Sequence, residues 1–134
     1  MPVLVSDRRA IQSSDDVVYV RQQVRQRAVE LGFNLIDQTK IVTAASELAR
    51  NTIQYGGGGE VIIEAVDDGI RRGLRLTFED KGPGIPDLDL ALRDGFSTRG
   101  GLGLGLGGAR RLSNEFHIDS RPGEGTRVTI TRWR

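Results

Sequence analysis

The placement of glycine constrains this chain more than any other feature of its sequence. Eighteen of the 134 residues are glycine, and eleven of these fall in two short stretches, 56–59 and 95–108. The usual glycine content is about 7%. The glycines keep no three-residue period, which excludes a collagen helix, and Leu and Arg interleave with the second stretch, which argues against a flexible linker. The remaining interpretation is backbone that must approach a neighbouring group closely.

Length and composition narrow the functional class. A chain of 134 residues predicts one domain, spanning residues 1–134. It contains no Cys, which excludes disulfides, thiolate metal sites and a catalytic thiol. The net charge of +1 offers no broad positive field for nucleic acid or anionic lipid, and we expect neither nucleic acid nor membrane as a partner. No apolar run approaches the roughly 20 residues of a membrane span, and no export signal precedes the domain, so we expect a cytoplasmic protein.

Helical and strand patterns occur in blocks along the chain. An alternating segment over 3–11 predicts a strand, and a helical pattern with Ser14 as N-cap runs to Leu31. A second helix begins after Asn34 or Asp37 and runs to about Gln54, where the first glycine stretch ends it. The other expected elements are strands over 60–66 and 73–80, a short helix over 87–94, a helix over 104–114, and strands over 115–119 and 126–133.

This order differs from the strict alternation of a parallel α/β fold. Blocks of helices and strands predict an α+β fold, a two-layer α/β sandwich with helices over one mixed, mostly antiparallel sheet. The segment 67–72 between two strands is expected to be a hairpin turn.

The second helix carries a carboxylate and a carboxamide on one face. Glu47 and Asn51 are four residues apart, one helical turn from each other. Such a pair can hold Mg²⁺ through oxygen and leave the carboxylate free to accept a proton from a hydroxyl. The same pattern fits an ordinary polar helix face on which Arg50 makes a surface ion pair.

A second candidate motif is Asp80-Lys81-Gly82-Pro83-Gly84-Ile85, at the end of a predicted strand. A plain Pro-Gly turn explains part of it. A turn does not explain why an Asp ends the strand. It also does not explain why two glycines follow at a spacing that would bring the backbone against a flat ligand. A carboxylate there can accept a hydrogen bond from an exocyclic amino group, which is one way to select adenine.

The third motif is the glycine-rich segment 97–108, which leads into a predicted helix. Exposed N–H groups at a helix N-terminus favour an anion, and a triphosphate fits. Gly103, Gly105 and Gly108 form a literal Gly-x-Gly-x-x-Gly, but no strand precedes it and no βαβ unit surrounds it, so a dinucleotide fold is excluded. The Walker A and protein-kinase signatures are also absent.

These motifs, in this order and with a late Gly125-Thr126, resemble the GHKL (Bergerat-fold) ATPase superfamily. Within this superfamily, the chain is similar to the anti-sigma-factor-type serine/threonine kinases, and most of all to the switch kinases of stressosome partner-switching modules. The sequence segments that carry this similarity are 46–51, 80–86, 94–98, 100–103 and 123–126. The similarity covers nearly the whole chain.

The resemblance implies a role for each motif. Glu47 would be the base that activates the acceptor hydroxyl, Asn51 the Mg²⁺ ligand and Asp80 the adenine reader, with Thr126 a second contact on the adenine side. Thr98 and Arg99 would approach the γ-phosphate. The full set of expected ATP-binding positions is Asn51, Asp80, Gly82, Gly84, Thr98, Arg99, Gly100, Gly101, Leu102, Gly103, Leu104, Gly105 and Thr126.

The resemblance also implies the partners. We expect an enzyme that uses ATP and Mg²⁺ to phosphorylate a Ser or Thr on a small antagonist or scaffold protein, and that then binds a downstream regulatory phosphatase. The alternative is a non-catalytic, nucleotide-gated module that sequesters a regulatory protein by contact alone.

Overall fold

Five strands and three helices make up the described chain. The computed structural model describes residues 3–85, 92 and 104–134. The elements are β1 (Val3–Ile11), α1 (Ser14–Glu30), α2 (Leu35–Gln54), β2 (Gly59–Asp67), β3 (Arg72–Asp80), α4 (Leu104–Arg111), β4 (Glu115–Arg121) and β5 (Gly125–Trp133). The short helix expected over 87–94 lies outside the described residues, apart from Leu92.

The strands form one sheet in the order β1-β2-β3-β5-β4. Every neighbouring pair among the described strands is antiparallel, so the sheet lacks the parallel pair that a mixed sheet would have. The reason lies between β1 and β2, where two antiparallel helices return the chain to the end of the sheet that it left. A single crossover helix would have made β2 parallel to β1.

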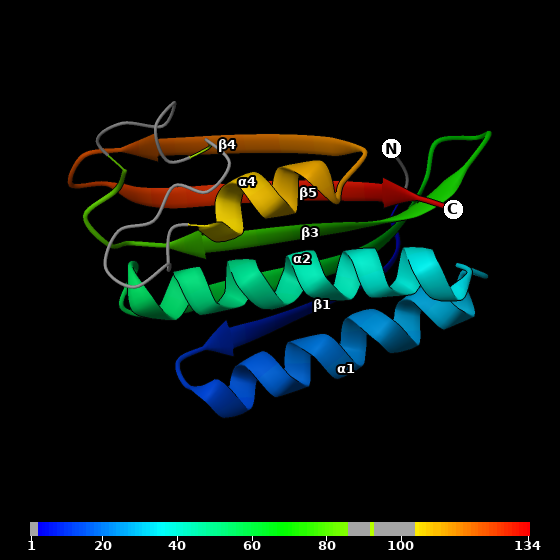
Figure 1. Cartoon of the computed structure of the whole chain (residues 1–134), viewed down its shortest axis with the longest axis horizontal. Coiled ribbons are helices and arrows are strands. Elements are labelled where there is room, and N and C mark those ends of the chain that lie inside the picture. Colours follow the sequence, from blue (N-terminus) through cyan, green and yellow to red (C-terminus); the bar gives the residue numbers. More distant parts are fainter. Residues whose placement is uncertain (1–2, 86–91, 93–103) are drawn as a thin grey trace.

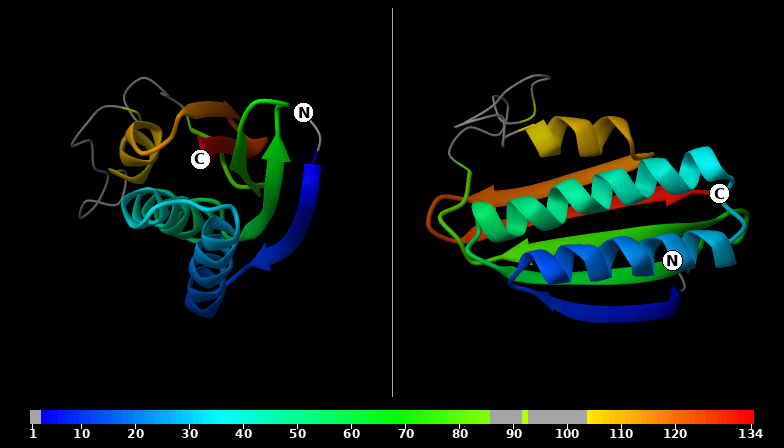
Figure 2. Two further views of the ribbon diagram at one scale, coloured as in Figure 1. Left: turned by 90° about the vertical axis from the view of Figure 1, so that its right-hand side faces the viewer. Right: turned by 60° about the horizontal axis from the view of Figure 1, so that its bottom comes forward.

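All three helices cover the same face of the sheet, which curls around them (Figures 1 and 2). This confirms the expected α+β two-layer arrangement. The core between the layers is aliphatic, because α1, α2 and β3 each turn a periodic apolar set inward. Its fully buried larger side chains include Val20, Val24, Ile41, Leu48, Val61, Leu74, Leu76 and Ile130.

The start of each long helix is set by a local hydrogen bond. Asn34 caps α2, since its side chain accepts from the backbone N–H of Asp37 at 2.8 Å. At α1 the N-cap is Ser13 rather than the expected Ser14. The carboxylate of Asp16 accepts the backbone N–H groups of Gln12 and Ser13, which places the cap one residue earlier.

The helix α4 is shorter than its pattern predicts. It ends at Arg111 instead of Asn114. The backbone N–H of Asn114 donates to the carbonyl of Thr131, and its side chain accepts from the N–H of Trp133, so Asn114 already belongs to the sheet. Among the described residues, no helix combines the length and apolar character that a membrane crossing requires.

Candidate active site

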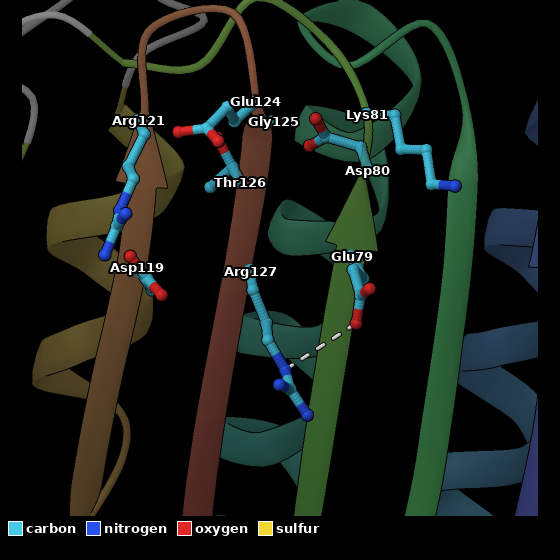
Figure 3. Close-up of a pocket in the computed structure, with 9 residues that line it drawn as sticks. All are labelled: Glu79, Asp80, Lys81, Asp119, Arg121, Glu124, Gly125, Thr126 and Arg127. Carbon is cyan, nitrogen blue, oxygen red and sulfur yellow. Dashed lines mark ion pairs between the residues drawn. The ribbon is translucent and has the colours of Figure 1, made fainter.

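The ends of β3 and β5 meet the end of α2. Asp80 is the last residue of β3, and its neighbour across the ladder is Thr126 of β5 (Figure 3). Strand alternation puts Asp80 on the same side of the sheet as the buried Phe78, which is the side that the helices cover. Gly56, two residues beyond α2, lies directly against the Asp80 carboxylate: a Cβ on Gly56 would fall 2.6 Å from Oδ2.

The Asp80 carboxylate is half-buried and held by backbone donors. Its Oδ1 accepts the N–H of Gly82 at 2.9 Å. Burial raises the pKa of Asp80, while the backbone N–H groups of Gly82 and Thr126 act against that rise. This arrangement presents an oriented acceptor in a partly dry position, which suits an amino group on a flat heterocycle.

Ser120 ties the loop after β3 to the β4–β5 turn. Its hydroxyl accepts the N–H of Ile85 at 2.8 Å and lies 2.8 Å from the hydroxyl of Thr126. The N–H of Gly123 also donates to the carbonyl of Pro83 at 2.8 Å. Sequence reasoning missed Ser120. The signal available was the β4–β5 hairpin, in which Ser120 is the cross-strand partner of Thr126.

Gly82 and Gly84 have protein backbone as their close neighbours. A Cβ on Gly82 would lie 2.7 Å from the Cα of Gly56. Gly84 has a φ of +78°, and the carbonyl oxygen of Arg121 occupies the space where its Cβ would stand. The expected close approach is therefore present, but it packs two loops and the end of α2 together rather than leaving these glycines facing open space.

Glu47 and Asn51 lie on α2, before the C-terminal end of the helix that approaches Asp80. The Glu47 carboxylate pairs with the guanidinium of Arg50 at 3.0 Å, and both side chains are nearly half exposed. The surface pair that the sequence left open does form. The backbone carbonyl of Asn51 accepts the N–H groups of Tyr55 and Gly56, at 2.9 and 3.4 Å. Asn51 is thus one turn from the segment that touches Asp80, and Glu47 is one turn further along the helix.

A hollow of about 270 Å³ opens at this end of the sheet (Figure 3). Asp80, Gly125 and Thr126 contribute to its lining, together with Glu79 and Arg127, which form an ion pair of 3.6 Å across β3 and β5. Strand alternation puts that pair on the side of the sheet away from the helices. Of the predicted site residues that the structure describes, Asp80 and Thr126 line this hollow, and Glu47 and Asn51 do not.

Most of the glycine-rich segment lies outside the described residues. Thr98, Arg99, Gly100, Gly101, Leu102 and Gly103 are outside the described residues, and Leu104 and Gly105 open α4. In the part of the chain that the structure describes, no cluster of three or more His, Asp or Glu side chains could hold a metal ion. A single oxygen such as that of Asn51 still fits Mg²⁺, because this ion often takes one or two protein ligands and fills its remaining positions with phosphate and water.

Residues 36–133 match the family described as histidine kinase-, DNA gyrase B- and HSP90-like ATPase. The chain belongs to this family. It is 51% identical over 118 residues to the serine/threonine-protein kinase RsbT of Bacillus subtilis (strain 168), which covers 88% of this chain and 89% of that protein. It is 32% identical over 127 residues to an anti-sigma F factor of Bacillus licheniformis, with 89% and 85% of the two chains covered.

Two solved structures share the fold of this chain. The RsbU and RsbW domains of Rv1364c from Mycobacterium tuberculosis superpose with a TM-score of 0.61 at 25% identity, over 95% of this chain and 32% of that one. The mycobacterial sensor histidine kinase MprB gives 0.58 at 19% identity, over 96% and 97%. As a member of an ATPase family, the chain binds ATP.

Proposed function

We propose that this chain transfers the γ-phosphoryl group of ATP to a serine or threonine hydroxyl on a small antagonist or scaffold protein of a sigma-factor-regulating partner switch. The enzyme class follows from the 51% identity to a serine/threonine-protein kinase over most of both chains. The chain is a serine/threonine protein kinase, and its anti-sigma relatives support the switch role. The structural observation that carries the proposal is the meeting of α2 with the Asp80–Thr126 pair, against Gly56.

Nucleotide recognition is assigned to the strand ends. Asp80 accepts a hydrogen bond from the adenine amino group, and the Thr126 hydroxyl, fixed by Ser120, borders the same position. Ser120 therefore acts as a positioning residue. The backbone of Gly82 and Gly84 shapes this corner, and the proposed phosphate contacts fall on Thr98, Arg99, Gly100, Gly101, Leu102, Gly103, Leu104 and Gly105. Bound ATP supplies the phosphoryl group, and bound Mg²⁺ offsets the charge on its phosphates.

Glu47 and Asn51 have the chemical roles on α2. The Asn51 carboxamide oxygen is the proposed Mg²⁺ ligand. The Glu47 carboxylate would accept the proton of the acceptor hydroxyl as that oxygen attacks the γ-phosphorus, while the bond from this phosphorus to the β,γ-bridging oxygen breaks and ADP leaves. Its ion pair with Arg50 is solvent-exposed. An exposed pair is worth about 0.2–1 kcal/mol, so it leaves Glu47 free to exchange partners.

The proposed cycle includes a second partner. Phosphorylation places about two negative charges on the antagonist or scaffold, which weakens or strengthens contacts at that surface and so changes what the kinase binds next. A downstream regulatory phosphatase is the proposed second partner. We propose that this reaction takes place in the cytoplasm.

Replacing Glu47 tests the catalytic assignment. With radiolabelled ATP and a purified antagonist of the partner-switching class, Glu47→Ala should lower labelling of the antagonist by about 10²–10⁴-fold, the usual contribution of a general base. ATP affinity measured by calorimetry should stay unchanged, because Glu47 is not assigned to nucleotide binding. Glu30→Ala is the matched control, since Glu30 forms the same type of i, i+3 pair, with Arg27 at 3.2 Å.

The outcomes separate the candidate functions. Full labelling by Glu47→Ala would remove Glu47 from the reaction. If the wild-type chain binds ATP but labels no antagonist that it binds, the non-catalytic binding module is the better description.

A further inference from the structure

The outer face of α1 carries apolar side chains that the fold does not use. Val17, Val20 and Val24 point inward and are buried, whereas Val18 and Val29 are 48% and 55% exposed. Valine is a weak helix former, and at an exposed position it buries nothing to compensate. The fold alone therefore gives no reason for valine at these two positions.

The helices α1 and α2 lie side by side (Figure 2). Val18 borders a groove between them that opens to solvent. The groove consists of two hollows, of about 470 and 310 Å³, that share Val18 and Arg21. Val42 and Ile53 of α2 contribute the apolar part of its opposite wall. Along α1 it runs from Ser14 to Gln26, about 18 Å at 1.5 Å per residue, which accommodates roughly three turns of a second helix.

The charges along the groove have one sign. Arg21, Arg25 and Arg50 line it, and no Asp or Glu is among its lining residues in the described chain. Arg25 reaches only the neutral Gln38, at 3.4 Å, and within the described residues Arg21 has no hydrogen bond or ion pair. The chain as a whole is nearly neutral, at +1. Arg50 pairs with Glu47 at 3.0 Å, so the positive charge of this surface that lacks an acidic partner lies on Arg21 and Arg25.

We propose that this groove binds an acidic amphipathic helix of a partner protein. Apolar residues of that helix would pack on Val18, Val42 and Ile53, and its flanking carboxylates would pair with Arg21 and Arg25. This is the helix-in-groove mode of recognition, with charge complementarity setting orientation and specificity. The proposal goes beyond phosphoryl transfer, because it concerns a surface distinct from the Asp80–Thr126 corner and requires no ATP.

Two labelled peptides test the groove. The first is an 18-residue helix with Leu at i, i+3, i+4 and i+7 spacing and Glu at the flanking positions, and the second has Lys in place of every Glu. Fluorescence anisotropy without nucleotide should show micromolar binding of the Glu peptide and at least about 10-fold weaker binding of the Lys peptide. The double substitution R21E/R25E should weaken binding of the Glu peptide by at least about 10-fold.

The matched control is R8E/R72E, which makes the same change in net charge at two exposed arginines outside the groove. It should bind the Glu peptide as the wild type does. If R21E/R25E fails to fold by circular dichroism, Arg21→Gln with Arg25→Gln replaces it, with a loss of at least about 5-fold expected.

Three results would overturn the proposal. The first is a Glu peptide that does not bind, or binds no better than the Lys peptide. The second is a groove variant that binds as tightly as R8E/R72E. The third is a wild-type dimer in sedimentation that R21E/R25E converts to a monomer, because a second copy of the chain would then be the occupant.

Discussion

At the scale of single residues, the site depends on how Asp80 is surrounded. Its carboxylate is half-buried, faces the helical layer and has Gly56 where any larger residue would collide with it. Backbone N–H groups of Gly82 and Thr126 support the ionised form against the cost of burial. An ionised acceptor kept in a partly dry position discriminates strongly between ligands, because an unmatched partner leaves it without a hydrogen bond.

Asp80→Asn should lower ATP affinity by about 10- to 100-fold, since a hydrogen bond to a charged group contributes about 1.5–3 kcal/mol. Burial raises the pKa of Asp80. The wild-type carboxylate therefore takes up a proton at a higher pH than an ordinary aspartate, and ATP affinity should fall as the pH drops through that raised value. Calorimetry at a series of pH values falling from 7.5 checks both effects, and Asp80→Asn should lack this pH dependence.

Stability provides the control for that variant. A carboxyl whose pKa is raised by folding contributes stability below its unfolded pKa and loses that contribution as the pH rises through the folded value. At pH 7 the neutral Asn should therefore be tolerated, with a Tm no lower than that of the wild type. A large drop in Tm, or an unchanged ATP affinity, would argue against a binding role for Asp80.

At the scale of elements, α2 is the helix that joins the core to the site. It buries Ile41, Ala45 and Leu48 against the sheet and carries Glu47 and Asn51 on a half-exposed face. Its two ends are defined locally, by the Asn34 cap at the start and by glycines after Gln54. Because Gly56 lies against Asp80, the position of Glu47 relative to Asp80 is set by the turns of α2 between Glu47 and the end of the helix.

Asn34→Ala should lower the free energy of unfolding by about 1 kcal/mol, the usual cost of losing an N-cap acceptor. In a domain of this size that corresponds to a fall in Tm of about 2–6 °C. Urea denaturation measures the change. Asn34→Asp, which keeps an acceptor for the Asp37 N–H, should stay close to the wild type, and equal losses in both variants would contradict the capping explanation.

At the scale of the whole molecule, Arg132 connects segments that are distant in sequence. Its guanidinium donates to the carboxylate of Asp37 at the start of α2, at 2.6 Å, and to the carbonyl of Leu112 after α4, at 2.9 Å. The side chains of Arg132 and Asp37 are 13% and 26% exposed. Arg132 Nε is buried with no partner among the described atoms. Arg132 thus connects β5 to α2 and to the segment after α4. Burial of its guanidinium, which removes water from the charged group, opposes this stabilisation.

Asp37→Leu alone should destabilise the fold by about 2 kcal/mol, less than the 3–5 kcal/mol of a fully buried pair because Asp37 is partly hydrated. The double variant Asp37→Leu with Arg132→Met should recover part of that loss, because it also removes the unpaired buried cation. Chemical denaturation of the wild type, the single and the double variant gives the comparison. A double variant less stable than the single one would show that Arg132 stabilises the fold through its contact with Leu112 instead.

Much of the fold was predictable because helices and strands depend on the spacing of apolar residues that are close together in the sequence. Alternating apolar residues predicted β2 and β3 and the hairpin turn between them, and apolar residues at helical spacing predicted α1 and α2. The end of α4 and the cap of α1 were each misplaced by one to three residues. In both cases a hydrogen bond decides the boundary: Asn114 joins the sheet, and Asp16 folds back onto Gln12 and Ser13.

The sequence by itself determined the elements, the glycine-dependent corner after β3 and the candidates Glu47, Asn51, Asp80 and Thr126, because each depends on spacing along the chain. Only the tertiary structure decided what these residues touch. It placed Gly56 against Asp80, Ser120 beside Thr126, and unpaired arginines along a groove between two helices. Such contacts join residues far apart in the chain, and their geometry depends on how the layers pack, which no local pattern encodes.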